Sequence, residues 1–468
     1  MDTKKLRQKI LDLAIRGKLV PQDPNDEPAS VLLERIRAEK ERLIKEGKIK
    51  RSKKSASDTP HYENVPFEIP KSWRWTCMAE VNEYNSASVD PSKSPNNDFE
   101  LYSVPAYETG MPEFVTGKDI SSSKKSVSKN DVLLCKINPH LNRAWIVSHY
   151  KENRPCLASS EWIIFRNSSI IPQYLSFCFT SNYFKELMLS NVSGVGGSLM
   201  RAQQAIVNKY LFPLPPIEEQ KRIVAAIEKW FSLIDTLESA KEDLRTSIEH
   251  TKSKILDLAI HGKLVPQDPN EEPAIELLKR INPSFTPCDN AHYPFDVPHN
   301  WVWAKGLDIF KPMKATSPLG DTFKYIDIDA IDNKRNVVTS VKVLNTKQAP
   351  SRASRYTEKG CVLFSMVRPY LRNIAMVTEN DCIASTGFFV CQGKGCLLPK
   401  FCYYQMLSNY VVDGLNDFMK GDNSPSITKA QIEEYIFPLP PYNEQQRIVA
   451  KIEELFAVID EIQKSIEA

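Results

Sequence analysis

Glycine is scarce in this chain. The 468 residues contain only 16 glycines, about half of the ~7% that is usual in soluble proteins. Neither a G-x-G-x-x-G turn nor a G-x-x-x-x-G-K-[ST] loop occurs, so the two common backbone cradles for nucleotide phosphates have no support here. These absences weigh against an enzyme that wraps its backbone around a phosphate-bearing cofactor.

Paired cysteines, long apolar runs and a strong net charge are also missing. The ten cysteines are scattered and no C-x-x-C occurs, so we expect reduced thiols that mostly fill cores, and no metal site. No apolar run approaches the ~18 residues of a membrane span, and we expect no membrane partner. With 61 basic and 58 acidic residues the net charge is +3, so only the distribution of charge is informative.

No recognisable set of catalytic residues is present. The sequence has no N-P-P-[FY] or D-P-P-[FY] stretch, which would hold an amino group for methylation, and its seven histidines lie outside any nucleophile motif. The D-P-S-K stretch at 90–93 resembles a nuclease carboxylate–lysine pair only at the level of chance. We therefore expect no catalytic residue in this chain.

What the chain does contain is an internal repeat. The stretch ILDLAIRGKLVPQDPN at 10–25 returns with one change at 255–270, and VPFEIPKSWRW at 65–75 returns as YPFDVPHNWVW at 293–303. YLFPLPPIEEQKRIVAAIEKWFSLID at 210–235 returns as YIFPLPPYNEQQRIVAKIEELFAVID at 435–460, and 132–147 is echoed weakly by 362–377. If the termini meet, the order of the pieces makes a circular repeat with a pseudo-twofold axis.

The repeat divides the chain into six segments. They are an N-terminal helical segment (1–38), a basic linker (39–64), a first variable domain (65–216), a central region with a long helix (217–292), a second variable domain (293–441) and a C-terminal helix (442–468). Short β-type runs, followed by helical stretches at 172–189 and 399–415, predict a mixed α/β (α+β) fold for each variable domain. The linker belongs to a basic run, with ten basic and three acidic side chains from Arg35 to Lys54, which predicts a solvated helix face, a mobile arm or a nonspecific phosphate contact.

The central region predicts one long helix. It begins after Pro215 and Pro216 and stops at Gly262, a length of about 43 residues or roughly 65 Å. Apolar side chains recur every 3.5 residues, and such a narrow seam needs a partner helix. We expect an antiparallel coiled-coil partner split between the two chain ends, the first piece ending at Gly17; the alternative is that each helix packs only onto its own domain. The predicted seam comprises Ile227, Trp230, Ile234, Leu237, Leu244, Ile248, Ile255 and Leu258, with Ile452, Leu455 and Ile459 on the last helix.

Two loops in each variable domain offer hydrogen-bond donors suited to DNA. One is stiffened by a proline between two predicted strands, and the other, polar loop precedes the FPLPP stretch. Individually, such residues are more often solubilising charges or ordinary connections. The candidate DNA-binding residues are Lys136, Asn138, His140, Asn142, Arg143, Ser198 and Arg201 in the first domain, and Arg368, Tyr370, Arg372, Asn373, Asn423, Ser424 and Lys429 in the second.

The paired motifs FPLPP-x-x-E-Q-x-R-I-V-A and ILDLAI-x-GKLVPQDP, each present twice, resemble those of the specificity subunit of type I restriction–modification systems. The resemblance covers essentially the whole chain. It implies that each variable domain is a target recognition domain, that each reads one half of a bipartite double-stranded DNA site, and that the helices set the spacing.

The resemblance also implies partners. Two modification subunits would dock on the helices, bind S-adenosylmethionine and methylate adenine, and restriction subunits would use ATP and Mg²⁺ to translocate and cut DNA in the cytoplasm of a prokaryotic cell. The chain itself would bind no cofactor and direct these activities without catalysis. Two other hypotheses stay open: a helical scaffold that does not read DNA, and a nuclease hidden in the variable domains.

Overall fold

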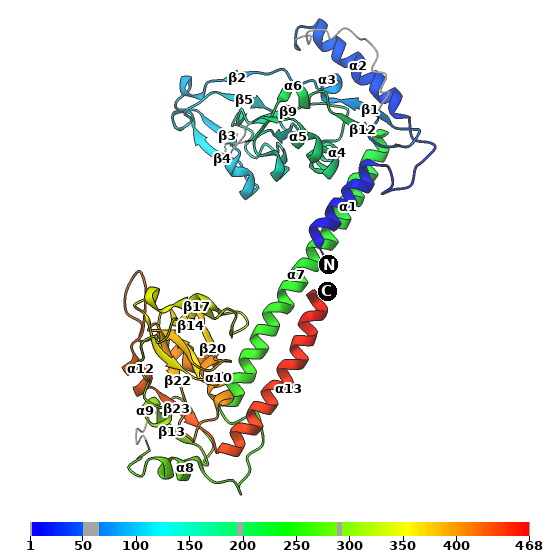
Figure 1. Cartoon of the computed structure of the whole chain (residues 1–468). Coiled ribbons are helices and arrows are strands. Elements are labelled where there is room, and N and C mark those ends of the chain that lie inside the picture. Colours follow the sequence, from blue (N-terminus) through cyan, green and yellow to red (C-terminus); the bar gives the residue numbers. More distant parts are fainter. Residues whose placement is uncertain (1, 50–64, 194–199, 288–292, 468) are drawn as a thin grey trace. The chain divides into compact units, whose positions relative to one another are not determined.

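The computed structural model describes residues 2–49, 65–193, 200–287 and 293–467 (Figure 1). The chain divides into two compact units, Met1–Ala240 and Lys241–Ala468, and each has its own large hydrophobic core. Within the described ranges, no helix combines the length and the apolar character needed to cross a bilayer. The nine cysteines in these ranges are free thiols, and all except Cys77 are buried, which agrees with their predicted role as core residues.

The first unit combines helices with a five-stranded and a three-stranded sheet. Strand order is β2-β5-β8-β3-β4 in the larger sheet and β7-β6-β9 in the smaller, and β1 pairs with β12 and β10 with β11. The helices are α1 (Thr3–Ile15), α2 (Ala29–Lys45), α3 (Met78–Val81), α4 (Pro172–Thr180), α5 (Asn182–Ser190), α6 (Gln204–Val207) and α7 (Ile217–Ile260), the last of which continues into the second unit. The strands are β1 (Arg74–Cys77), β2 (Ser88–Val89), β3 (Asp98–Tyr102), β4 (Glu113–Thr116), β5 (Lys124–Val127), β6 (Val132–Cys135), β7 (Ala144–Ile146), β8 (Cys156–Ala158), β9 (Trp162–Phe165), β10 (Val192–Ser193), β11 (Arg201–Ala202) and β12 (Leu211–Leu214).

The second unit repeats this plan with a four-stranded and a five-stranded sheet. Strand order is β17-β14-β21-β18 and β15-β16-β20-β19-β22, and β13 pairs with β23. The helices are α8 (Ala274–Ile281), α9 (Gly306–Ile309), α10 (Pro399–Leu407), α11 (Asn409–Asn416), α12 (Lys429–Glu434) and α13 (Tyr442–Glu467). The strands are β13 (Val302–Lys305), β14 (Thr322–Ile326), β15 (Ile331–Asp332), β16 (Val337–Val338), β17 (Lys342–Asn345), β18 (Ala353–Thr357), β19 (Val362–Ser365), β20 (Ile374–Met376), β21 (Cys382–Ser385), β22 (Phe388–Cys391) and β23 (Ile436–Leu439).

Each mixed domain is closed where its first and last strands pair. β1 runs antiparallel to β12, with Trp75 opposite Pro213. β13 runs antiparallel to β23 in the same register, with Trp303 opposite Pro438. The two repeated stretches that flank a variable domain are thus neighbours in space, and the differing residues lie between them in sequence.

A buried hydrogen-bond network explains why Trp, Gln and Glu recur in three separate motifs. The Trp73 indole N–H donates to Glu219 at 2.8 Å, and the Gln22 side chain donates to the same carboxylate at 2.5 Å. In the second unit, Glu444 accepts from Trp301 at 3.0 Å and from Gln267 at 2.6 Å. One carboxylate in the first turn of α7 or α13 therefore joins the P-x-x-W and PQDP stretches.

Glycine ends the two repeated helices, as predicted. Gly17 and Gly262 have φ of +65° and +66°, a left-handed conformation that glycine adopts without steric cost. A Cβ on Gly17 would lie 2.4 Å from the Pro70 ring, and a Cβ on Gly262 would lie 2.4 Å from Pro298. The end of the repeated helix therefore contacts the proline of the P-x-x-W stretch in each unit, Pro70 in the first and Pro298 in the second.

The long predicted helix is present as α7, with 44 residues. In the first unit α1 lies beside it in antiparallel orientation (Figure 1): Arg7 pairs with Asp235 at 2.5 Å and with Glu238 at 3.2 Å. In the second unit α13 pairs with the other end of α7, where Lys252 lies 2.6 Å from Asp460. Each half of α7 therefore has its own partner helix.

The predicted apolar seam is not continuous. Ile227, Ile234, Ile248, Ile255 and Ile452 are buried, and Leu455 and Ile459 pack against the core of the second unit. Trp230, Leu237 and Leu244, however, are 49%, 36% and 42% exposed. Leu244 lies on α7 between the stretch that pairs with α1, at Asp235 and Glu238, and the stretch that pairs with α13, at Lys252.

Local structure departs from the sequence predictions in three further places. The stretches 172–189 and 399–415 each form two helices rather than one, because Ser181 and Ser408 cap a second helix by accepting a hydrogen bond from Phe184 N and Val411 N. The third place is the β-type run KYIDIDAI at 324–331, which the sequence predicts as one strand: β14 ends at Ile326, and a 3₁₀ turn begins at Ile328.

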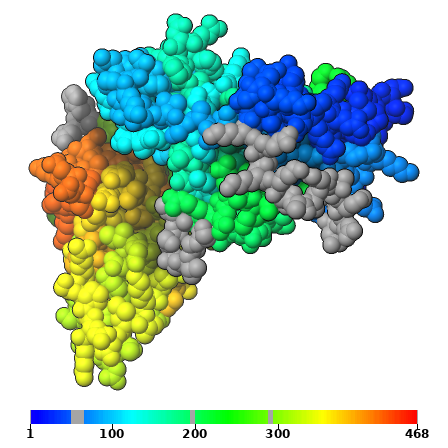
Figure 2. Space-filling view, turned by 90° about the horizontal axis from the view of Figure 1, so that it is seen from above, coloured from blue at the N-terminus to red at the C-terminus, as the bar shows by residue number. Residues whose placement is uncertain are grey.

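The basic linker predicted over 39–64 begins inside a helix. α2 continues to Lys45 on the surface of the first unit (dark blue in Figure 2). Its charges are partly neutralised within the unit: Arg37 pairs with Glu80, and Arg42 lies 2.6 Å from Glu39. Residues 50–64 lie outside the described residues.

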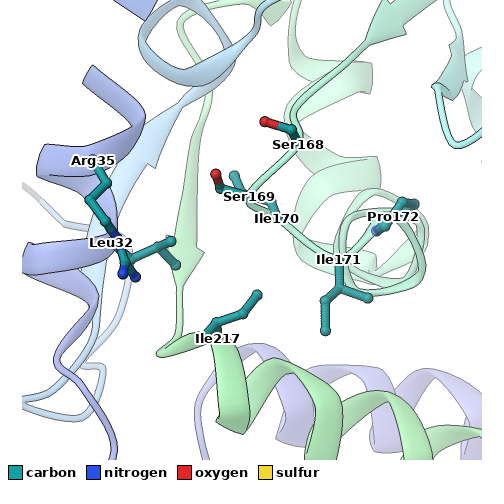
Figure 3. Close-up of a pocket in the computed structure, with 8 residues that line it drawn as sticks. All are labelled: Leu32, Arg35, Ser168, Ser169, Ile170, Ile171, Pro172 and Ile217. Carbon is teal, nitrogen blue, oxygen red and sulfur yellow. The ribbon is translucent and has the colours of Figure 1, made fainter. Parts of the chain in front are cut away.

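A shallow hollow of about 370 Å³ marks the place where α2, the β9–α4 connection and the start of α7 meet (Figure 3). Leu32, Ile171 and Ile217 line it together with the hydroxyls of Ser168 and Ser169. It belongs to the contact between the helical segments and the first variable domain, away from the loops proposed to touch DNA.

Candidate nucleic-acid interface

The proline loops form the same turn in both units. In the first, β6 leads into a 3₁₀ turn at Pro139–Leu141 and returns as β7; in the second, β19 leads into a turn at Pro369–Leu371 and returns as β20. Residues 138 and 142 are left-handed, with φ of 48° and 52°, and so are 368 and 372, with φ of 48° and 53°. The backbone repeats although asparagine stands at both positions in one unit and arginine at both in the other.

Left-handed backbone is strained for arginine. Asparagine tolerates this region, whereas the left-handed conformation costs arginine on the order of 1–3 kcal/mol in conformational energy. The surrounding fold must therefore impose the turn on the second unit, and strain of this kind gathers at functional sites.

The second predicted loop braces the first in each unit. Asn138 N donates to Met200 O at 2.8 Å, and Ala202 N donates to Lys136 O at 2.8 Å. In the second unit Arg368 N donates to Pro425 O at 2.8 Å, and Ile427 N donates to Met366 O at 2.9 Å. The structure thus brings together the two segments that the sequence identified separately.

The second left-handed residue of each turn caps a helix. The Asn142 amide donates to the carbonyl of Thr180, the last residue of α4. The Arg372 guanidinium donates at 2.7 Å to the carbonyl of Leu407, the last residue of α10. These side chains satisfy free C-terminal carbonyls and fix the turn to the helices behind it, and burial lowers the pKa of Arg372.

Two of the predicted DNA contacts are buried. Arg143 and Asn373, which follow the turns at equivalent positions, are 9% and 8% exposed. Arg143 donates to Ile137 O at 3.2 Å and lies 3.8 Å from Glu108. The structure therefore places the Arg143 guanidinium inside the domain, where it supports the loop from within, and its contact with DNA stays a prediction.

The exposed residues at the turns differ between the units. His140 and Leu141 stand at the tip of the first, and Tyr370 and Leu371, which are 48% and 40% exposed, stand at the tip of the second. Arg368 is also exposed and donates to Asn423 O at 2.9 Å. One backbone therefore presents two different sets of side chains.

The remaining predicted residues lie around these turns. Arg201 pairs with Glu161 at 3.3 Å, and Lys429 pairs with Glu433 at 3.1 Å within α12. Asn423 and Ser424 are exposed, and Lys136 is half-buried near Lys125, whose pKa is lowered by burial and by that like charge. Ser198 lies outside the described residues.

One group of side chains has the composition of a metal site. Ligand atoms of Glu100, His149 and Cys156 lie within 4.8 Å of one another. Glu100, however, already accepts the N–H of Tyr150 at 3.0 Å and that of Lys151, and burial together with Glu100 raises the pKa of Cys156 to about 12. These groups are satisfied within the domain as a neutral thiol and a hydrogen-bonded carboxylate, and we assign no metal to them.

Sequence reasoning missed a second polar surface. Asp327, Asp329 and Asn333 lie beside the turn of the second unit, in a hollow that they share with Arg352 and Asn373. The sequence offered the acidic stretch after β14 and the candidate Asn373 as separate signals, and it could not join them because they lie far apart along the chain.

Each of the two mixed domains carries a braced polar turn and packs on one half of the long helix α7. The chain matches the family described as "Type I restriction modification DNA specificity domain" over residues 70–245 and 320–468. It belongs to this family of type I restriction–modification specificity subunits.

Curated relatives and solved structures agree. The chain is 29% identical to the type I restriction enzyme EcoAI specificity subunit of Escherichia coli, over 98% of this chain and 90% of the relative. It is 26% identical to the EcoEI specificity subunit of the same species, over 99% and 91%. The fold is similar to the HsdS subunit from Thermoanaerobacter tengcongensis, with a TM-score of 0.53 and 20% identity over 86% of this chain and 93% of that one. A structure described for complex assembly of a type I restriction–modification system gives a TM-score of 0.62 at 20% identity, over 86% of this chain and 94% of that one.

Proposed function

We propose that this specificity subunit reads a bipartite DNA site, one half with each variable domain. The repeated braced turn supports this most strongly, because one strained backbone presents His140 and Leu141 in one unit and Tyr370 and Leu371 in the other. Side chains that differ on a common backbone suit two domains that read different sequences. Exposed imidazole, phenol and guanidinium groups supply donors for base edges and phosphates.

In this proposal α7 sets the gap between the half-sites. Each half of the helix is tied to its own unit, through Arg7 in the first and Lys252 in the second. Because both anchors lie on one continuous helix, the number of residues between them governs the spacing of the domains. The same helices and the chain ends would complete the circular repeat.

The helices also offer a surface for the modification subunits. Trp230, Leu237 and Leu244 of α7 are 49%, 36% and 42% exposed, and exposed apolar side chains on a helix indicate an interface that another chain covers. We propose that two modification subunits dock here.

The chemistry would belong to the partners. Modification subunits would bind S-adenosylmethionine and methylate adenine, restriction subunits would use ATP and Mg²⁺, and this chain would bind no cofactor and catalyse no step. The relatives named above are bacterial, and we place the assembly in the prokaryotic cytoplasm, where the DNA lies.

Selection from random duplex DNA tests the proposal. The full chain is mixed with its modification subunits, bound duplexes are recovered, and the enriched sequences are read. We expect one split motif with a fixed gap. Flat enrichment would contradict DNA reading and favour a scaffold, whereas metal-dependent cleavage by the chain alone would favour a nuclease.

A further inference from the structure

A hollow of about 580 Å³ opens beside the turn of the second unit. It is formed by the 3₁₀ turn after β14, the segment before β18, and the turn between β19 and β20. Its lining residues are Asp327, Ile328, Asp329, Ile331, Asn333, Arg352, Leu371 and Asn373. We call it the second-domain hollow.

Asn373 lines this hollow without a hydrogen-bond partner for its side chain. The residue is only 8% exposed, yet among the described residues its side-chain amide neither donates nor accepts a hydrogen bond. Its amide lines an open hollow, so its donor and its acceptor are both available to a ligand that offers the complementary groups.

A carboxylate and a guanidinium in the hollow are also left available. Asp327 accepts the N–H of Ile328 at 2.8 Å and lies near the Tyr325 hydroxyl and Lys342, but it forms no ion pair with any residue in the described ranges. Arg352 is exposed and forms no ion pair with any residue in the described ranges. Asp329, by contrast, lies 2.7 Å from Lys342 and is already neutralised.

The Asp327 carboxylate and the Arg352 guanidinium line the same hollow and form no ion pair with each other. They therefore suit a ligand that presents a hydrogen-bond donor, for Asp327, beside two hydrogen-bond acceptors, for Arg352. A C·G base pair has this pattern in the major groove, with the N4 amino group of cytosine next to O6 and N7 of guanine. Carboxylates accept from cytosine N4, and arginine donates in a bidentate fashion to guanine. A carboxylate is repelled by phosphates, so Asp327 favours contact with a base edge over contact with the DNA backbone.

The geometry points to the second-domain hollow as the reader of a C·G base pair, with Asp327 accepting from cytosine, Arg352 donating to guanine, and Asn373 contacting an adjacent base edge. This inference rests on the proposed function and specifies it for one half-site. The first unit differs, because Arg143 occupies the position of Asn373 and lies beside Glu108. The two half-sites are therefore read by different chemistry.

The selection experiment described above tests the inference with two variants of one residue. Arg352→Ala removes both the charge and the paired N–H donors of the guanidinium, whereas Arg352→Lys keeps the charge but cannot donate in a bidentate fashion. We expect both to lose discrimination at one C·G position of the half-motif read by the second domain, by about 5- to 150-fold, the value of one good bidentate contact. Asp327→Asn should relax the same position. The half-motif read by the first domain should not change.

Lys347→Ala is the matched control, because it removes one exposed positive charge from the same domain outside the hollow. We expect it to weaken binding equally for all sequences. Thermal unfolding establishes that each variant is folded, and the unchanged first half-motif establishes that the complex still assembles.

Two outcomes would overturn the inference and are distinguishable. A wild-type split motif that Arg352→Ala, Arg352→Lys and Asp327→Asn all leave unchanged would refute the hollow as a base reader and leave the proposed function intact. A wild-type complex that enriches no split motif would refute the proposed function, and this inference with it.

Discussion

Glu219 and Glu444 each accept hydrogen bonds from an indole and an amide that come from two other repeated stretches. The sequence showed that these residue types recur, but it could not show that they meet, because Gln22 and Glu219 are separated by 197 positions. The network gives the repeat a physical reason: three motifs are retained together because each satisfies the buried polar groups of the others.

Removing the carboxylate should destabilise the first unit. Glu219→Ala leaves the Trp73 N–H and the Gln22 amide without an acceptor, at an expected cost of about 2–4 kcal/mol. Urea unfolding of the full chain measures the change. The neighbouring Glu218 is exposed and pairs with Lys221 on the surface, so Glu218→Ala should change stability by less than about 0.5 kcal/mol; equal effects would show that the network is not important for stability.

The same carboxylates should make stability depend on pH. Burial raises the pKa of Glu219 and Glu444 above the ordinary 4.5, although the hydrogen bonds from the tryptophans and glutamines oppose it. Because the folded state then holds these protons more tightly than the unfolded state, stability falls as pH rises from 4.5 through the raised pKa values. The double variant Glu219→Gln/Glu444→Gln should have a shallower fall between about pH 4.5 and 7 in urea unfolding, and an identical slope would contradict the assignment.

At the scale of elements, the sequence could predict the long helix, the ends of the repeated helices and the equivalence of the two proline turns. It could not predict which elements pack against one another. Spacing of apolar residues predicted α7 and the face it buries, and glycine predicted where the repeated helices end. The same spacing could not show that Leu237 and Leu244 stay exposed. Ser181 was missed as a helix start because it lies inside an apolar run that suits one continuous helix, and Asp327 and Arg352 were missed as neighbours because only the tertiary fold joins them.

The helix end at Gly17 should tolerate no side chain. Gly17→Ala forces a left-handed alanine, at about 1–2 kcal/mol, and also places its Cβ against the Pro70 ring. Gly110 has φ of +70°, but no atom of the described residues lies within 4 Å of the place that a Cβ would take, so Gly110→Ala should cost only the backbone strain. Thermal unfolding should therefore show a clearly larger loss for Gly17→Ala, and equal losses would mean that the proline contact relaxes freely.

At the scale of the whole molecule, α7 is the one helix of the described chain that belongs to both compact units. Its ends are buried against separate cores, and its middle carries exposed leucines. A continuous helix transmits a change in its length to whatever is fixed at its ends, which makes its length a testable determinant of the DNA gap.

Lengthening α7 should lengthen the gap. One extra heptad between Leu237 and Ile255 adds about 10.5 Å, or about three base pairs, with a rotation of only ~20°. Selection from random duplexes should return both half-motifs unchanged and a longer gap. Altered half-motifs with an unaltered gap would refute α7 as the spacer.

The exposed leucines should govern assembly. Leu237→Ser/Leu244→Ser should weaken binding of the modification subunits by at least about tenfold, because an apolar interface loses about 1.5–3 kcal/mol for each buried leucine. Val343 is 67% exposed on β17, so Val343→Ser removes an exposed apolar side chain away from the helices and should have no effect. Titration of labelled chain with modification subunits measures both, and equal affinities would place the docking surface elsewhere.

The antiparallel pairs β1–β12 and β13–β23 bring the first and last residues of each variable domain side by side. A segment whose ends adjoin can be replaced as a cassette, since the host chain needs no new path to bridge a different insert. Exchange within these strands leaves the indole–carboxylate network of the host chain intact, because Trp73 precedes β1 and Glu219 follows β12. If each variable domain reads DNA as proposed, one crossover event would change the DNA preference of that domain and keep the helices that carry it.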